Sequence, residues 1–254
     1  RLIPGTEGGT QHPFFSPDGK WIGYRSKADD KLKKIAVGGG VPVVLSNAPA
    51  VLGASWGADD TIVYADLKGI MRVSPNGGSP EMLVGEISFH PRLLPGGRSL
   101  MFTITTGEGY KTAVQSLETG KRKILFTGDC ASYLPTGHIV YGLGNNLCAI
   151  PFDPEKAEVR DGTIPVIEGV FRRASSAPQY AVSASGTLVY LPGGRGGASF
   201  ISQRNLVWVD RNGREEPLPV PPNTYAFPRI SPDGTRVALT VGSDTYANIW
   251  IWDI

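Results

Sequence analysis

The 254-residue chain has few of the side chains that most often carry out chemistry, with three histidines and two cysteines. It contains no His-Glu-x-x-His or Gly-x-x-x-x-Gly-Lys-Ser/Thr sequence. These are the signatures of zinc peptidases and phosphate-binding loops. A Ser-His-Asp triad would also be hard to build from three histidines. We therefore expect a protein that is not an enzyme.

Strong charge and long apolar runs are missing as well. The 25 basic and 23 acidic residues leave a formal net charge of +2, a field too weak to indicate a nucleic-acid partner. No segment approaches the roughly 18 apolar residues of a membrane span, so we expect no direct membrane insertion. Because the chain begins at Arg1 rather than Met, we expect a processed product or a piece of a longer polypeptide.

Glycine and proline, in contrast, are abundant, and they punctuate short apolar runs. The stretch FSPDGKWIGY at 15–24 returns as ISPDGTRVAL at 230–239. Six tight turns of this kind divide the chain: Ser16–Gly19, Gly57–Asp60, Leu94–Gly97, Leu134–Gly137, Ser183–Gly186 and Ser231–Gly234. Their first residues lie 41, 37, 40, 49 and 48 residues apart. That period is typical of propeller blades or helical arrays, and the β-branched and aromatic runs after each turn favour blades.

Each repeat offers four short strands, which predicts an all-β fold: a six-bladed β-propeller of four-stranded antiparallel blades, in one domain over residues 1–254. The last repeat stops at Ile254, before its fourth strand, while residues 1–5 precede the first repeat. We expect residues 1–5 to pair with residues 249–252. The N-terminal strand would then join the C-terminal blade and close the ring without a bare sheet edge.

The motif HPFFSPDGKWIGY followed by KLKKIAVGGGVPVVL resembles the WD40-like PD40 repeats of the TolB β-propeller family. The stretch LVWVDRNGREEPL is similar to the propellers attached to bacterial serine/threonine kinases. The resemblance covers essentially the whole chain, although Ser-Pro-Asp-Gly is intact only in the first and last repeats. It implies a protein-interaction platform in a periplasmic or other extracytoplasmic location, and it brings no catalytic residues that could be carried over.

Alignment of the repeats yields a candidate binding site. In propellers the first strand of each blade lines the central channel, so residues four and two positions before each turn should surround one mouth of it. We expect a polar funnel there that binds a partner or ligand, formed by His12, His90, Arg92, Gln179, Phe227 and Arg229. Alternatively, these residues only hydrate a water-filled channel or bond the backbones of the blades.

Metal and disulfide chemistry are not expected. As metal ligands, His12 and His90 would need a third partner, and Cys130 is the only candidate at the aligned positions. Cys130 and Cys148 fall on the first and third strands of one repeat. Two strand spacings separate them by about 9.5 Å, beyond disulfide reach. We predict two free, half-buried thiols and no cofactor.

The favoured function is a monomeric binding, scaffold or sensor module that recognises a protein, peptide or small ligand at the channel mouth. The first alternative is a calcium-dependent, lactonase-like hydrolase, because six-bladed propellers also host such enzymes. The aligned channel positions carry no carboxylate, so calcium would have to rely on loop residues such as Asp29, Asp30 or Glu108. The second alternative is an accessory propeller of a larger kinase or peptidase.

Overall fold

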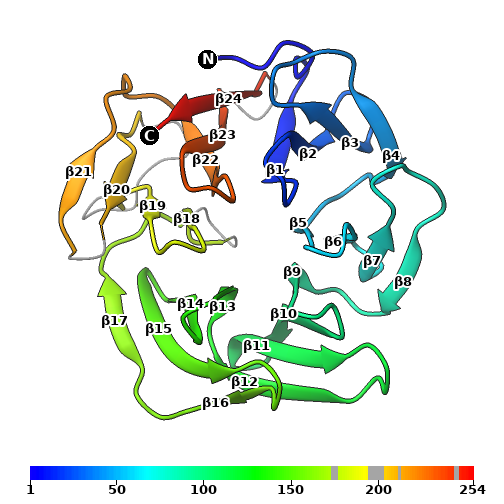
Figure 1. The fold of residues 1–254 in the computed structure, drawn as a ribbon, viewed down its shortest axis with the longest axis vertical. Helices are drawn as coiled ribbons and strands as arrows, with labels where there is room; N and C mark the ends of the chain where they lie inside the picture. Colours follow the sequence, from blue (N-terminus) through cyan, green and yellow to red (C-terminus); the bar gives the residue numbers. More distant parts are fainter. Residues whose placement is uncertain (173–176, 194–202, 211–212, 243–245) are drawn as a thin grey trace. The chain divides into compact units, whose positions relative to one another are not determined.

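The computed structural model describes residues 1–172, 177–193, 203–210, 213–242 and 246–254 (Figure 1). These residues form strands β1 to β24, which are joined by turns and loops. The described ranges contain no helix, and therefore none with the length and hydropathy to cross a bilayer. The strands make six antiparallel sheets, here called blades 1 to 6 in chain order. The predicted fold class, a six-bladed β-propeller, is confirmed.

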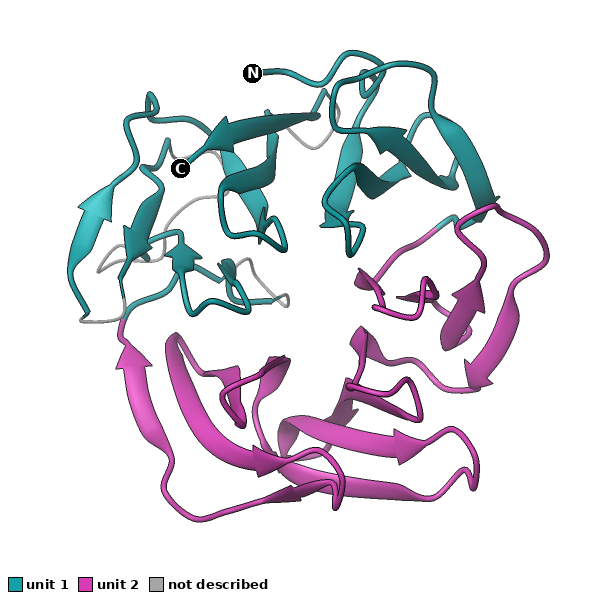
Figure 2. Ribbon diagram, in the orientation of Figure 1, with its two compact units in different colours: residues 1–49, 169–254 teal, residues 50–168 magenta. Residues whose placement is uncertain are grey.

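The chain divides into two compact units (Figure 2). Unit 1 comprises residues 1–49 and 169–254 and holds blades 1, 5 and 6. Blade 1 consists of β1 (Thr10–Phe15), β2 (Trp21–Ser26), β3 (Lys31–Ala36) and β4 (Val43–Asn47). Blade 5 consists of β18 (Tyr180–Val182), β19 (Leu188–Tyr190), β20 (Val207–Val209) and β21 (Glu215–Pro217). Blade 6 consists of β22 (Tyr225–Ile230), β23 (Arg236–Val241) and β24 (Asn248–Asp253).

Unit 2 comprises residues 50–168 and holds blades 2, 3 and 4. Blade 2 consists of β5 (Ala54–Trp56), β6 (Ile62–Ala65), β7 (Ile70–Val73) and β8 (Glu81–Val84). Blade 3 consists of β9 (Phe89–Leu93), β10 (Ser99–Thr106), β11 (Gly109–Ser116) and β12 (Arg122–Thr127). Blade 4 consists of β13 (Asp129–Leu134), β14 (His138–Leu143), β15 (Asn146–Asp153), β16 (Glu158–Val159) and β17 (Ile164–Ile167). That the two units form one domain stays a prediction.

All six predicted turns join the first two strands of their blades. In each, the amide of the fourth residue donates to the carbonyl of the first: Gly19 to Ser16 at 2.9 Å, Asp60 to Gly57 at 3.1 Å, Gly97 to Leu94, Gly137 to Leu134 and Gly186 to Ser183 at 3.0 Å, and Gly234 to Ser231 at 2.9 Å. The fourth residue has a φ between 61° and 90° throughout, which explains why glycine stands there in five of the six turns.

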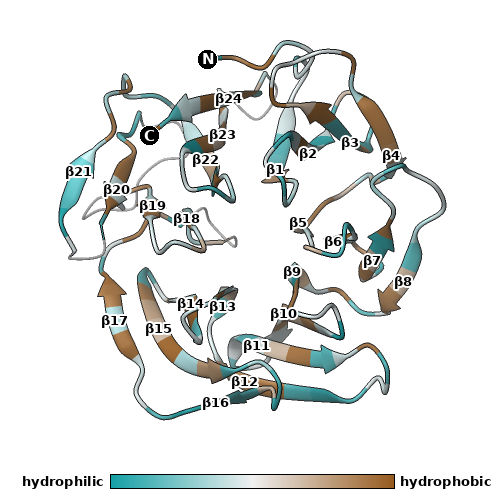
Figure 3. Ribbon diagram, in the orientation of Figure 1, coloured by the Kyte–Doolittle hydropathy of each residue, from teal (hydrophilic) through white to brown (hydrophobic). Residues whose placement is uncertain are grey.

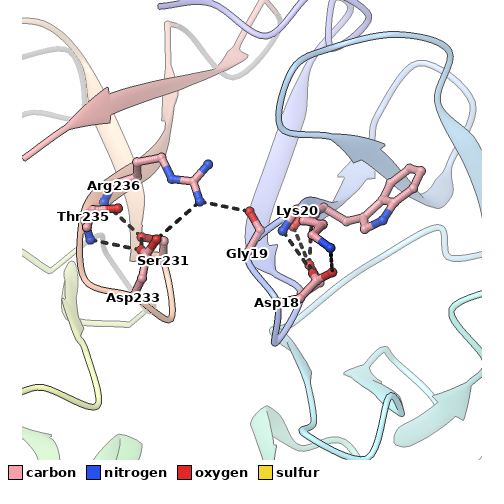
Figure 4. A network of polar contacts seen from close by, with 9 residues as sticks. Asp18, Gly19, Lys20, Ser231, Asp233, Thr235 and Arg236 are labelled. Carbon is pink, nitrogen blue, oxygen red and sulfur yellow. Dashed lines mark hydrogen bonds and ion pairs between the residues drawn. The ribbon is translucent and has the colours of Figure 1, made fainter.

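In the Ser-Pro-Asp-Gly turns the side chains form further hydrogen bonds (Figure 4). Ser231 Oγ donates to Asp233 Oδ1, which also accepts from the Thr235 amide at 3.1 Å. These bonds, that of Ser231 first, lower the pKa of Asp233 to about 2. Arg236 Nη2 then donates to the Gly19 carbonyl at 3.2 Å. Within unit 1, the turn of blade 6 is therefore tied to the turn of blade 1.

The N-terminal segment completes blade 6, as predicted. The Ile3 amide donates to the Ile249 carbonyl at 2.9 Å, and the Ile251 amide donates to the Arg1 carbonyl at 2.8 Å. Leu2 forms an antiparallel bridge with Trp250. Ile3 is 1% exposed and packs in a core cluster with Ile22, Ile35, Ile249 and Ile251. The first residues of the chain are thus fixed both by backbone pairing and by apolar burial.

The last strands of several blades contain apolar residues (Figure 3), some of which are exposed. On β4 of unit 1, Val43 and Val44 are 40% and 45% exposed. On β17 of unit 2, Ile164 is 54% exposed. The rest of the apolar residues on the strands largely fill clusters within each unit, such as the one around Val63, Leu100 and Phe102 in unit 2. Some residues of the last strands belong to the core all the same, as Leu45 on β4 and Val84 on β8 show at 2% and 3% exposed.

Blade 4 departs from the expected pattern in two ways. The stretch after Asp153 contains the short strand β16, and both β16 and β17 pair with β15. Cys130 and Cys148 are free thiols on β13 and β15, with β14 between them, as predicted. The prediction of half-burial is wrong, because they are only 8% and 6% exposed. Burial raises the pKa of the Cys148 thiol.

Candidate functional site

The first strands of the blades bring the predicted site residues together in two groups, one in each unit. In unit 1, β18 packs beside β22, and β22 beside β1. In unit 2, β5 packs beside β9, and β9 beside β13. Unit 1 thus gathers His12, Gln179, Phe227 and Arg229, while unit 2 gathers His90 and Arg92.

A bulge interrupts the first strand at the position four residues before the turn. In blades 1, 3, 4 and 6 the register of this strand shifts there against its neighbour. The bulge residues His12, His90, Cys130 and Phe227 have φ values of 51° to 54°. Left-handed backbone is uncommon for residues other than glycine and costs of order 1–3 kcal/mol at each position. Four blades therefore hold a strained residue at the same structural position.

The amides of three bulge residues bond to the preceding blade. The His90 amide donates to the Leu52 carbonyl at 3.0 Å. The Cys130 amide donates to Thr103 Oγ1 at 3.1 Å. The Phe227 amide donates to Gln179 Oε1 at 2.6 Å. These bonds within each unit help hold the strained backbone in place.

In unit 1 the candidate residues differ in exposure. Gln179 is 2% exposed and Phe227 7% exposed, and the Gln179 amide nitrogen donates to the Ala177 carbonyl at 2.9 Å. The half-buried His12 ring lies 4.2 Å from the Phe227 ring, centroid to centroid. Arg229 is also half-buried, and its Nη1 donates to the Pro228 carbonyl at 2.8 Å. Gln179 and Phe227 are thus buried, while His12 and Arg229 are half-buried.

In unit 2, His90 and Arg92 are both half-buried on β9. Gly53, at the bulge position of blade 2, lies directly against His90. A Cβ on Gly53 would come within 2.7 Å of the His90 backbone. Ser55 Oγ donates to the Pro91 carbonyl at 2.8 Å, which fixes β9 between the two site residues. The glycine and the serine therefore position His90 and Arg92 from the neighbouring blade.

The loop carboxylates considered as calcium ligands are already engaged with cations. Asp29 lies 2.7 Å from Lys33 Nζ, Asp30 lies 2.7 Å from Arg25 Nη2, and Glu108 lies 2.6 Å from Lys111 Nζ. The ammonium of Lys111 lowers the pKa of Glu108. Among the described residues, no three His, Cys, Asp or Glu side chains cluster as a metal site would require. A cation would have to compete with these ion pairs.

One buried polar residue was missed by the sequence analysis. Asp129, on β13, is 4% exposed and directly precedes the bulge residue Cys130. Asp129 lies five residues before its turn, outside the aligned positions four and two residues before each turn. Extension of that comparison by one residue would have found it.

No protein-family model and no curated protein matches the chain. Solved structures do. TolB from Acinetobacter baumannii is 17% identical, with a TM-score of 0.64 over 95% of this chain and 63% of that one. A gluconolactonase from Xanthomonas campestris is 12% identical, with a TM-score of 0.71 over 99% and 89%. Regucalcin from Agrobacterium tumefaciens, described as a calcium-binding protein, is 15% identical, with a TM-score of 0.65 over 94% and 86%. At such low identity the likeness shows the fold alone.

Proposed function

We propose that this chain is a non-catalytic binding propeller that recognises a protein or peptide through the first strands of its blades. The contacts would be the half-buried His12 and Arg229 in unit 1 and His90 and Arg92 in unit 2. Gln179 and Phe227 are positioning residues beneath the first pair. The likeness to TolB is consistent with this function but rests on fold alone.

The recurring left-handed bulge is the observation that carries this proposal. A bulge re-aims the side chain of its residue, and strained backbone that persists at one structural position is characteristic of functional sites. In blades 1 and 3 the bulge residue is a histidine. Phe14 follows His12, and Arg92 follows His90, two residues later on the same strand. Arginine is well suited to such contacts because its planar guanidinium binds carboxylates and carbonyls through several hydrogen bonds and stacks on aromatic rings.

The ion pairs of Asp29, Asp30 and Glu108 support this function over calcium-dependent hydrolysis. A calcium ion takes six to eight oxygen ligands, with carboxylates prominent among them. The three loop carboxylates are neutralised by Lys33, Arg25 and Lys111 instead. Their use as ligands would leave three cations without their present partners.

The test is affinity capture from an extract of bacterial cell envelopes, with calcium and with chelator in parallel. The wild-type chain is compared with the Arg92→Gln/Arg229→Gln double variant. Arg72→Gln is the control, because Arg72 is a partly exposed arginine of β7 that pairs with Glu81. We expect a partner that the wild type and the control retain and the double variant loses. Calcium binding by the purified chain, without such a partner, would contradict the proposal and favour the hydrolase.

A further inference from the structure

Among the residues that the structure describes, blade 4 alone carries an extra hairpin after its third strand. After β15 the chain turns at residues 154–157 and pairs back along β16, with Phe152 opposite Val159 and Asp153 opposite Glu158. The Arg160 amide then donates to the Pro151 carbonyl at 2.9 Å. The blade would be complete without this excursion, because β17 pairs directly with β15. Added loops of this kind often carry function on a repeated scaffold.

The hairpin lines a solvent-open pocket of about 350 Å³ beside the Leu134–Gly137 turn. Its lining includes Thr136, His138, Pro151, Asp153, Pro154 and Arg160. The Phe152 amide donates to the Gly137 carbonyl at 2.8 Å, which fixes the turn to β15 on the floor of the pocket. The volume lies at the low end of small-molecule sites and suits a ligand with a single ring.

The charged groups of the pocket form a loosely held pair. Arg160 Nη2 lies 3.7 Å from Asp153 Oδ2, and the Arg160 side chain is 73% exposed. Asp153 Oδ1 accepts from the amides of Glu155 and Lys156, both at 3.1 Å. These bonds, that of Lys156 first, lower the pKa of Asp153, so it remains a carboxylate at neutral pH. Arg160 can therefore turn one edge of its guanidinium to a ligand while Asp153 offsets part of its charge.

The other polar group is the His138 ring. Its Nδ1 lies 3.1 Å from the Thr136 carbonyl, which can only accept a hydrogen bond. Thr136 Oγ1 lies 3.3 Å from the same nitrogen, so both contacts to Thr136 hold the ring at the edge of the pocket. Pro151 and Pro154 supply apolar surface next to these groups.

From this arrangement we propose that the blade 4 pocket binds a small organic monocarboxylate with an apolar body. Arg160 pairs with the carboxylate, and Pro151 and Pro154 cover the apolar body. A dianion such as phosphate is disfavoured, because one guanidinium offset by Asp153 cannot balance two negative charges. This proposal does not depend on the first-strand residues of the proposed function.

The test uses benzoate as the probe and benzamide as its neutral counterpart. Each is titrated into the ¹⁵N-labelled chain, and the amide signals of Gly137 and Arg160 are followed by NMR. We expect benzoate to shift both signals saturably at millimolar concentrations and benzamide to shift them much less. Arg160→Gln should weaken benzoate binding at least about fivefold, since it removes a charge-assisted hydrogen bond.

Arg98→Gln is the matched control. Arg98 directly follows the equivalent turn of blade 3, and its side chain is 82% exposed, so the variant loses the same charge outside the pocket. Equal weakening by Arg98→Gln and Arg160→Gln would overturn the site. Shifts of equal size with benzamide or inorganic phosphate would overturn the carboxylate class. The absence of any shift at Gly137 and Arg160 would overturn the pocket altogether.

Discussion

The Gln179 side chain accepts a hydrogen bond at 2.6 Å from the amide of Phe227, 48 residues further along the chain. The bond joins blade 5 to the strained bulge of blade 6 within unit 1. Phe227 is 7% exposed, so its amide has little access to water. The bond therefore satisfies a buried donor that the β-ladder leaves out.

Replacement of Gln179 by methionine keeps the size of the side chain but removes this acceptor. We expect the free energy of unfolding to fall by about 1–3 kcal/mol, because a buried amide loses its partner. Urea denaturation of the variant measures the effect. The comparison is Gln115→Met, which removes an acceptor from Arg122. Arg122 also pairs with Glu86, so a smaller loss is expected there, and equal losses would contradict the role given to Gln179.

Substitution of Gly53 tests the close approach of its backbone to that of His90, between blades 2 and 3. The φ of Gly53 is 126°, and a Cβ would meet the His90 backbone at 2.7 Å. Gly78 has a φ of 130°, but a Cβ there would meet nothing within 4 Å. Both alanine variants carry similar backbone strain, and only Gly53→Ala adds a clash. We expect Gly53→Ala to cost about 1–3 kcal/mol more than Gly78→Ala in chemical denaturation, the usual cost of overpacking. Equal costs would mean that blades 2 and 3 are less tightly packed here than the structure shows.

The contribution of the N-terminal strand can be measured at one side chain. Ile3 is 1% exposed, whereas its neighbour Leu2 is half-buried. Ile3→Ala should lower the free energy of unfolding by about 2–5 kcal/mol, the range for a large aliphatic side chain lost from a core. Leu2→Ala should cost clearly less. If both variants unfold like the wild type, residues 1–5 do not stabilise blade 6.

The acid stability of the chain should depend on Asp233. Its pKa is about 2 in the folded chain, against an ordinary value of 3.8. A lowered pKa contributes stability that is fully present above the ordinary value and is lost as the pH falls through the folded value. The side chain is 53% exposed, so the effect is screened by solvent and modest. We expect the wild-type Tm to fall more steeply than that of Asp233→Asn as the pH falls from 3.8 to about 2. Parallel curves for wild type and Asp233→Asn would contradict the assignment.

The repeat, the turns and the closing strand were predictable because each depends on local chemistry. A proline and a glycine at fixed places specify a turn such as Ser231–Gly234, and the short β-type runs specify the strands beside it. The bulges were not predictable. His12 and Phe227 adopt left-handed backbone without glycine, asparagine or aspartate at the position. Only the packing of adjacent strands imposes that geometry.

In the candidate site, too, the features that depend on packing between strands could not be predicted from the sequence. Alignment of the repeats placed His12 and Arg229 on neighbouring first strands, as the structure shows for unit 1. It could not show that Gln179 would be buried with its side-chain amide fully used. The register of two strands far apart in sequence decides which buried backbone group has no partner in the β-ladder. The hairpin of blade 4 was also missed, because β16 is only two residues long.

The central claim is that the half-buried arginines of the first strands contact a protein or peptide partner. The most direct measurement is the equilibrium dissociation constant of the captured partner for the wild type, Arg92→Gln, Arg229→Gln and the control Arg72→Gln. We predict that each first-strand variant raises Kd by about tenfold or more, as expected for an arginine at the centre of an interface, and that the control does not. Unchanged affinity in both first-strand variants, with the fold intact, would contradict the account.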